Sequence, residues 1–243
     1  MPGASGFHHL DILLYAVFPY VALILFLAIT IQRYRSQAFS YTSLSSQFLE
    51  NKQHFWGMVP FHYGILTVLA GHVVAFCFPR SVLWWNAQPA RLWILEITAL
   101  VAGLLTLVGL GAVILRRTGN ARLRAVTSPA DWIVFAMLLF QVGTGVWVAL
   151  AHRWGSSWFA ASLTPYLRSL LFLNPDIAYV TAMPTMVKTH IVSAFALIAF
   201  FPFTRLVHIL VIPNMYLWRK TQVVRWYAER RTLRRIERTG GDA

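Results

Sequence analysis

Five long runs of apolar residues dominate this chain and limit what it can fold into. They span about residues 10–31, 55–78, 92–115, 130–151 and 187–212. A transmembrane helix needs about 20 consecutive apolar residues. Inside lipid a segment must satisfy its own backbone hydrogen bonds, so only helices and closed barrels cross a membrane. The pattern predicts an all-α integral membrane bundle of five transmembrane helices.

Composition agrees with a membrane protein and excludes an ordinary soluble domain. Hydrophobic residues make up 58% of the 243 residues and charged residues only 12%, whereas a soluble domain has about 25% charged residues. Five spans leave no room for a separate soluble domain. Residues 1–243 are therefore expected to form one membrane domain that ends in a basic tail, residues 213–243.

The formal charge of +13 is distributed unevenly along the chain. Alternate loops, Arg205 and the tail together hold sixteen of the 21 Lys and Arg residues, and the opposite loops hold the other five. The positive-inside rule therefore predicts an outer N-terminus and a cytoplasmic C-terminus. The tail is expected to meet anionic lipid or a partner subunit, and nucleic acid is not an expected partner.

Four histidines lie within two of the predicted spans, where an ionisable residue indicates a functional site. They are His62 and His72 on the second span and His190 and His208 on the fifth. Because these spans run in opposite directions, His72 shares its depth with His190, and His62 shares its depth with His208. The eighteen residues from His190 to His208 would make five turns of one helix, with a kink expected at Pro202.

Two pairs of facing imidazoles predict bis-histidine ligation of two haems. A lone buried histidine is more often a hydrogen-bonded core residue, but two pairs at matched depths favour ligation. Imidazole is a good ligand for iron, and helical bundles hold cofactors between facing helices. Cys77 is the only cysteine, so the C-x-x-C-H attachment motif is absent and the haems would be held non-covalently. Zinc fits less well, because its sites need about four ligands close together.

Residues near the histidine pairs have further possible roles. Gly64 and Gly71 are expected to leave space for a macrocycle. Arg205 on the inner side and Lys188 on the outer side either pair with haem propionates or extend to the lipid interface.

Glu96 is an acidic residue near the outer end of the third span. It either relays a proton or pairs with Arg91. The residues alone leave both alternatives open.

The segments around the histidines resemble a known family. "FHYGILTVLAGH" and "KTHIVSAFALIAFFPFTRLVHILVIPNMYLWRKTQVVR", together with "SSQFLE" and "ADWIVFAMLLFQVGTG", are similar to the gamma subunit of membrane-bound respiratory nitrate reductase. That subunit is a five-helix dihaem cytochrome b. The resemblance covers nearly the whole chain and is weakest in the outer loops and after Arg225. Nitrite oxidoreductases, which run the opposite reaction, share the two histidine motifs.

The resemblance implies an electron path across the membrane. Quinol would be oxidised near an outer b haem, which His72 and His190 would hold. Electrons would pass to an inner b haem, held by His62 and His208. They would then reach an iron–sulfur beta subunit and a molybdenum alpha subunit in the cytoplasm.

The resemblance also implies a place for quinol and leaves other functions open. Quinol would bind beside Gly71 and His72, and the family adds a lysine from the following outer loop. Here that loop has no lysine and holds Arg80 and Arg91. Arg91 is a candidate for the quinol site, and the source of the hydrogen-bond donor stays open. The complex would lie in a bacterial or archaeal cytoplasmic membrane. Two alternatives are the reverse path in a nitrite oxidoreductase and a non-redox membrane anchor or permease with a histidine-lined metal or proton site.

Overall fold

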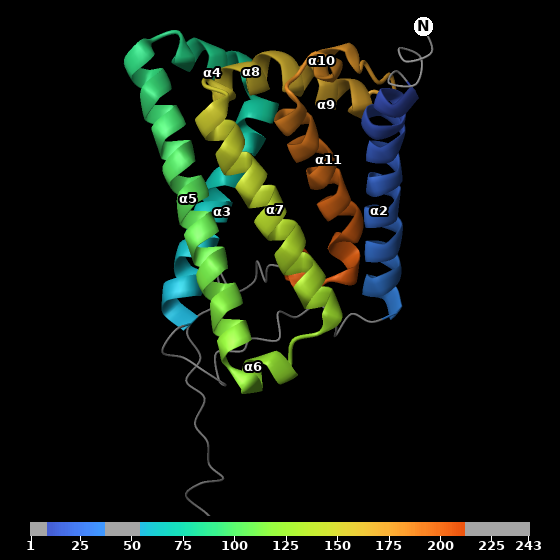
Figure 1. Ribbon diagram of the computed structural model, residues 1–243. Coiled ribbons are helices and arrows are strands. Elements are labelled where there is room, and N and C mark those ends of the chain that lie inside the picture. Colours follow the sequence, from blue (N-terminus) through green and yellow to red (C-terminus); the bar gives the residue numbers. More distant parts are fainter. Residues whose placement is uncertain (1–8, 37–53, 212–243) are drawn as a thin grey trace, which may run out of the picture. The chain divides into compact units, whose positions relative to one another are not determined.

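The computed structural model describes residues 9–36 and 54–211 of the chain (Figure 1). Helices and short connections make up these residues, and no β-strand occurs among them. Five helices are long and apolar enough to cross a membrane, so the prediction of a five-span, all-α membrane protein is confirmed. The chain separates into two units, Met1–Ile209 and Leu210–Ala243, and all four histidines belong to the first. The basic tail lies outside the described residues.

Five long helices carry the apolar runs. The first runs from His9 to Ser36 and contains a π-helical turn, η1 (Leu13–Val17), followed by α2 (Phe18–Ser36). The others are α3 (His54–Cys77), α5 (Pro89–Gly119), α7 (Pro129–Ala151) and α11 (Thr185–Phe200). Helix α5 has 31 residues, so it continues past the apolar run into the basic residues Arg116 and Arg117.

Proline and capping residues fix where α5 and α7 begin. Pro89 and Pro129 stand in the first turns, where the missing N–H is not needed and the fixed φ suits a helix. At α7 the Ser128 hydroxyl accepts from the Asp131 N–H, and the Asp131 carboxylate accepts from the Ser128 N–H. This capping box satisfies two N–H groups that the helix cannot. A short helix, α6 (Ala121–Ala125), connects α5 to α7.

The helices pack in an order that differs from their order along the chain. Helix α5 packs on α3 and α7, α7 packs on α11, and α11 packs on α2 (Figure 1). Helices α3 and α11, which carry three of the four histidines, are not among the closely packed pairs in the described part of the chain. These two helices are therefore held in place through α5 and α7, not by packing on each other.

Glycines bring α3 and α5 close together. A Cβ at Gly64 would lie 2.5 Å from the Thr106 Oγ1 and 2.7 Å from the Ala102 carbonyl oxygen. A Cβ at Gly109 would overlap the backbone of Phe61. Helices in lipid have no hydrophobic drive to associate, so small residues that allow close contact supply much of the attraction. Gly64 is used for this contact, and the expectation that it leaves space for a macrocycle is wrong.

Short helices cover one end of the bundle, beside the C-terminus of α3 (Figure 1). They are α4 (Pro79–Asn86), α8 (Gly155–Trp158), the π-helical turn η3 (Phe159–Leu163), α9 (Thr164–Leu171) and α10 (Ala178–Thr181). Tyr166 is fully buried there, and its hydroxyl donates to the Tyr15 carbonyl oxygen at 2.7 Å. Burial raises the pKa of the Tyr166 phenol, so the group stays protonated and remains a donor. This bond ties α9 to the first span.

The fifth span is not one continuous helix, contrary to expectation. Helix α11 is followed by a 3₁₀ turn, η4 (Phe201–Phe203), and then by Thr204, which is extended with φ −116° and ψ 175°. A second 3₁₀ segment, η5 (Arg205–Val211), carries His208. His190 and His208 therefore do not lie on one face of a single helix.

Pro202 accounts for the break. Proline has no N–H for the helical ladder and its ring clashes with the preceding turn. The carbonyl oxygens freed at the break have a partner, because Arg33 of α2 donates to those of Pro202 and Thr204 at 2.6 and 2.8 Å. The predicted kink at Pro202 is thus a full interruption, and a cation from another helix stabilises it.

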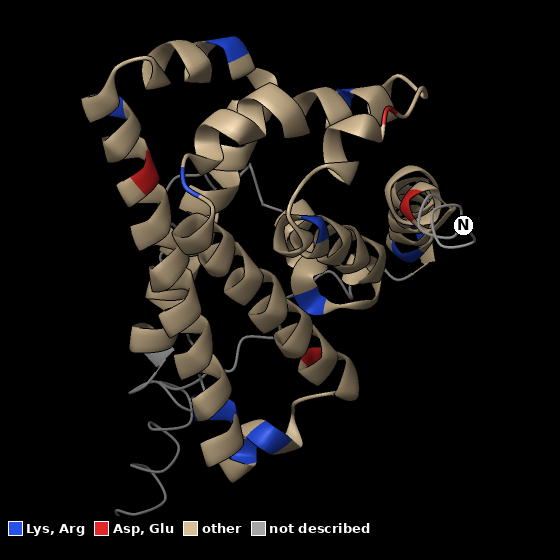
Figure 2. Cartoon of the chain, turned by 45° about the horizontal axis from the view of Figure 1, so that its top comes forward, with Lys and Arg blue, Asp and Glu red and all other residues tan. Residues whose placement is uncertain are grey.

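Charged residues gather toward the two ends of the bundle (Figure 2). The end that includes α6 carries Arg116, Arg117, Arg122 and Arg124. The opposite end, with α4, α8, α9 and α10, carries Arg80, Arg91, Arg153 and Arg168. Following the predicted orientation, we refer to the α6 end as the inner end and to the opposite end as the outer end. The orientation itself stays a prediction.

We expect Gly109→Val to weaken the packing of α5 on α3. A side chain there would overlap the Phe61 backbone, which cannot swing away as a flexible side chain can. Overpacking of this kind costs about 1–3 kcal/mol. Gly111→Val is the matched control, because a Cβ at Gly111 meets no atom within 4 Å. The amount of chain in the membrane and its thermal inactivation in detergent measure the effect, and equal behaviour of the two variants would contradict the close contact.

Candidate functional site

The structure brings His72 and His190 near each other. His72 lies on α3 and His190 on α11, and the two imidazoles are close enough to interact electrostatically. The ring of Phe159, on η3, meets His72 edge to face with a centroid distance of 5.2 Å. Phe159 also packs against the buried cluster that contains Ile191, next to His190. The two histidines thus lie near each other although α3 and α11 are not closely packed.

His62 and His208 lie beside a shared core cluster. Phe61 precedes His62 on α3, and Leu206 stands two residues before His208 on η5. Both pack against a cluster of buried residues contributed by α5 and α7, namely Leu110, Val134 and Leu138. The chain segments that carry His62 and His208 therefore pack against the same buried cluster. In the described part of the chain, an interaction between the two rings themselves is found for the outer pair only.

Three of the four histidines hydrogen-bond a carbonyl of their own segment through Nδ1. For His62, His72 and His208 the acceptors are the carbonyl oxygens of Met58, Val68 and Arg205, at 2.8, 2.8 and 2.7 Å. A carbonyl oxygen only accepts, so Nδ1 carries a proton, and in the neutral imidazole Nε2 then keeps its lone pair. Metal-binding histidines are oriented in this way, with the other ring nitrogen as the ligand.

His190 has a different partner, which the sequence analysis missed. Its Nδ1 lies 3.0 Å from the Thr144 Oγ1 of α7. The amide nitrogen of Gln141 lies 3.3 Å from Nδ1 and 3.2 Å from Nε2. Because the Gln141 nitrogen is nearly equidistant from Nδ1 and Nε2, it lies near the plane that passes midway between them. The lone pair of Nε2 is directed outward from the ring, away from that plane. The polar pair Gln141 and Thr144, three residues apart in an apolar span, was the signal available in the sequence.

The donor set fits two bis-histidine haems. In His62, His72 and His208 one nitrogen bonds a carbonyl and the other is left as a lone pair, as haem iron requires of an axial ligand. In His190 the Thr144 hydroxyl lies beside Nδ1, and the Gln141 amide lies between the two nitrogens. Residues 9–36 and 54–211 contain no group of three or more His, Cys, Asp or Glu placed to hold a metal ion. A bis-imidazole site needs only two side chains from the protein. The arrangement in pairs therefore suits haem better than a tetrahedral metal site.

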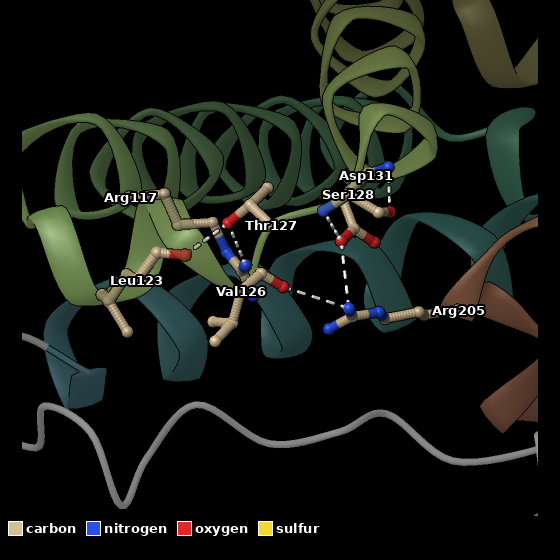
Figure 3. Close-up of polar contacts among 7 residues, drawn as sticks. All are labelled: Arg117, Leu123, Val126, Thr127, Ser128, Asp131 and Arg205. Carbon is tan, nitrogen blue, oxygen red and sulfur yellow. Dashed lines mark hydrogen bonds and ion pairs between the residues drawn. The ribbon is translucent and has the colours of Figure 1, made fainter.

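Arg205 has protein partners at the inner end (Figure 3). Its guanidinium lies 3.3 Å from the Asp131 carboxylate and donates to the Val126 carbonyl oxygen at 3.3 Å. Asp131 also caps α7, so the ion pair ties η5 to the start of that helix. Lys188, at the outer end, donates to the Thr181 carbonyl oxygen at 3.3 Å. Contact with a haem propionate stays a prediction for both cations.

The family model of the nitrate reductase gamma subunit matches residues 11–227 of this chain. The chain belongs to the nitrate reductase gamma subunit family. The nitrate reductase gamma chain of Bacillus subtilis (strain 168) is 31% identical over 222 residues, which cover 88% of this chain and 97% of that protein. The respiratory nitrate reductase 2 gamma chain of Escherichia coli (strain K12) is 26% identical over 221 residues, with 89% and 97% covered. With its five apolar spans, the chain is a multi-pass membrane subunit of the nitrate reductase type.

In this gamma-family chain, Glu96 binds the first residues of α8. Its carboxylate accepts from the N–H groups of Gly155 and Ser156 at 3.1 and 2.9 Å. It also accepts from the Ser156 hydroxyl at 2.5 Å. The same hydroxyl accepts from the Asn86 amide of α4 at 2.9 Å. Glu96 therefore joins α5, α8 and α4 at the outer end.

Arg91 lies against aromatic rings at the same end. Its guanidinium carbon is 4.7 Å from the ring centroid of Trp84 and 5.3 Å from that of Trp85. Among the described residues no ion pair joins Arg91 to Glu96, so the alternative in which the two pair with each other is wrong. A role for Arg91 in binding quinol, or for Glu96 in relaying a proton, stays a prediction.

We expect Glu96→Ala to destabilise the outer end of the gamma-family chain. Three donors would lose a charged acceptor, and hydrogen bonds to charged groups contribute about 1.5–3 kcal/mol each. Glu96→Gln keeps one accepting oxygen and should be inactivated by heat at a temperature between those of the wild type and the Ala variant. A proton relay would give a different result, in which Gln slows turnover as much as Ala does and leaves thermal stability unchanged.

Proposed function

We propose that this chain is the electron-transfer subunit that oxidises quinol at the outer side of the membrane and passes electrons to nitrate-reducing partner subunits. The hydrogen bonding of the four histidines is the observation that carries the proposal. Each Nδ1 has an acceptor, so each Nε2 keeps a lone pair within the membrane bundle. Unpaired polar groups are costly in lipid, and iron is a metal that imidazole suits.

Two b haems would be held non-covalently, one by His72 and His190 and the other by His62 and His208. A bound haem supplies one-electron chemistry at a potential that its axial ligands and their hydrogen bonds set. The protein's part is to hold the four rings in fixed orientations. Carbonyl oxygens do this for three rings and Thr144 for the fourth. Because the ligands are neutral, the protein adds no charge to the membrane interior.

Quinol would be oxidised beside Gly71 and His72. Both residues are exposed on α3, and a Cβ at Gly71 would meet no atom within 4 Å. A flat ring can therefore approach this face without displacing another side chain of the protein. Protons released from quinol at this end would leave to the outer side. Arg91, held against the tryptophan rings at the same end, would donate a hydrogen bond to a quinol oxygen.

Electrons would leave at the inner end, to an iron–sulfur beta subunit and a molybdenum alpha subunit. The positive-inside rule supports a cytoplasmic inner end in a bacterial or archaeal cytoplasmic membrane. Anionic lipid would bind the basic tail there, at about 1 kcal/mol per basic residue near the surface. The names of the family and of its matched members support nitrate reduction over the reverse path of a nitrite oxidoreductase.

We expect two b-type haems for each copy of this chain in the purified complex. Acid acetone should extract both, since the sequence has no C-x-x-C-H motif for covalent attachment. Haem content per chain and a reduced-minus-oxidised spectrum measure this. Haem that stayed on the denatured polypeptide, or fewer than two haems per chain, would count against the proposal and in favour of an anchor or permease.

Ligand variants assign each haem. His72→Ala and His190→Ala should remove the outer haem, and His62→Ala and His208→Ala the inner one. All four should stop quinol-driven turnover, while a soluble donor that feeds the partner subunits directly bypasses them. Quinol should still reduce the outer haem when the inner one is lost, but should reduce nothing when the outer one is lost. If a complex without the inner haem still oxidised quinol at the wild-type rate, electrons would not pass through the two haems in series.

We expect Gly71→Val to slow quinol oxidation at least about tenfold, equivalent to about 1.4 kcal/mol. A Cβ at Gly71 meets no atom of the described residues within 4 Å, so folding should persist and the inner-haem spectrum should be unchanged. Gly111→Val, also in open space but on α5, is the matched control. Turnover with quinol is compared with turnover with a soluble donor. If both variants oxidise quinol at the wild-type rate, the quinol site lies elsewhere.

A further inference from the structure

One of the four candidate ligands is held differently from the other three. His62, His72 and His208 each bond a carbonyl of their own segment, within four residues. His190 instead bonds Thr144, a side chain of the neighbouring helix α7, at 3.0 Å. The orientation of this ring therefore depends on another helix.

The direction of the bond follows from the single proton of a hydroxyl group. The Thr144 Oγ1 lies 2.9 Å from the Phe140 carbonyl oxygen and 3.0 Å from that of Gln141. Both carbonyls only accept, so the hydroxyl proton is directed to the backbone of α7. The Thr144 oxygen is then left to accept the proton of His190 Nδ1. Thr144 is buried, so water does not compete for this bond.

Two neighbours of Thr144 enclose the same ring. The side-chain oxygen of Gln141 accepts from the hydroxyl of Ser193, one turn along α11 from His190. A Cβ at Gly145 would lie 3.0 Å from the Cε1 of His190, so the ring packs against bare backbone. One turn of α7 thus fixes the position of the imidazole. The Gln141 amide nitrogen lies 3.3 Å from Nδ1 and 3.2 Å from Nε2 and so favours neither, which leaves Thr144 as the group that selects the protonated nitrogen.

We propose that Thr144 is a positioning residue that directs Nε2 of His190 toward the outer haem and sets its strength as a ligand. The inference rests on the proposed function, because it takes His190 as an iron ligand. A hydrogen bond from Nδ1–H to an acceptor raises the basicity of the ligating nitrogen. A more basic ligand stabilises oxidised iron over reduced iron. Loss of the Thr144 oxygen should therefore raise the reduction potential of the outer haem and leave that of the inner haem unchanged.

The test compares three substitutions in the assembled complex. Thr144→Val keeps nearly the same shape and removes the acceptor, and Thr144→Ser restores the oxygen. Thr106→Val is the matched control, because Thr106 is also buried and its hydroxyl also bonds the carbonyl four residues earlier, that of Ala102 at 2.7 Å, but on α5. Haem content, a potentiometric titration and the ferric low-spin resonance of each haem are measured, and the His72→Ala complex identifies the outer-haem signals.

We expect Thr144→Val to raise the reduction potential of the outer haem and to change its ferric resonance, while the inner haem of this variant keeps its wild-type signals. In Thr144→Ser and Thr106→Val, both haems should keep the wild-type potential and resonance. Loss of the outer haem alone would also support the proposal. If the valine variant does not assemble, Thr144→Ala removes the same oxygen with less bulk and carries the same expectation. Wild-type outer-haem signals without the oxygen, or equal shifts of both haems, would overturn it. A wild-type complex without two haems would instead overturn the proposed function.

Discussion

The hydrogen bond from an imidazole Nδ1–H to an acceptor within the bundle is the interaction on which the rest of this structure depends. A histidine brings two polar nitrogens into a region where unsatisfied groups are costly. Bonding Nδ1 to a carbonyl one turn earlier satisfies the donor without a further side chain. A single lone pair is left on each ring. The bundle therefore presents four directed acceptors in two pairs, an arrangement that suits metal coordination.

At the break in the fifth span, the histidine Nδ1 again bonds a nearby backbone carbonyl oxygen. In η5 the chain is 3₁₀, with three residues per turn, and His208 correspondingly bonds the carbonyl three residues earlier, that of Arg205. The side chain of Arg205 pairs with Asp131 at the start of α7. Arg205 thus supplies the acceptor for His208 and anchors the segment that carries this histidine to the bundle. Arg33, which bonds the carbonyls freed at Pro202, keeps the interruption satisfied in lipid.

Apolar run length was sufficient to predict five spans, because lipid permits few structures and each needs a known number of residues. Depth in antiparallel spans also paired the histidines, and the structure brings one predicted pair, His72 and His190, near each other. It did not show that Gly64 serves contact with α5, nor that Glu96 binds α8 instead of Arg91. Those partners are close in space and distant in sequence. Thr144 was missed because a threonine in an apolar helix usually bonds only its own backbone.

Helix α7 holds both histidines of the fifth span in place, although it carries neither of them. Asp131 at its inner end holds η5 through Arg205, and Thr144 toward its outer end holds His190. These contacts lie thirteen residues apart, about 20 Å along the helix. Helix α3, which carries His62 and His72, is attached through α5. The distance between facing imidazoles therefore depends on how α5 packs on α7, where a Cβ at Gly103 would lie 3.4 Å from Val146. A change at that contact would alter both histidine pairs together without touching either.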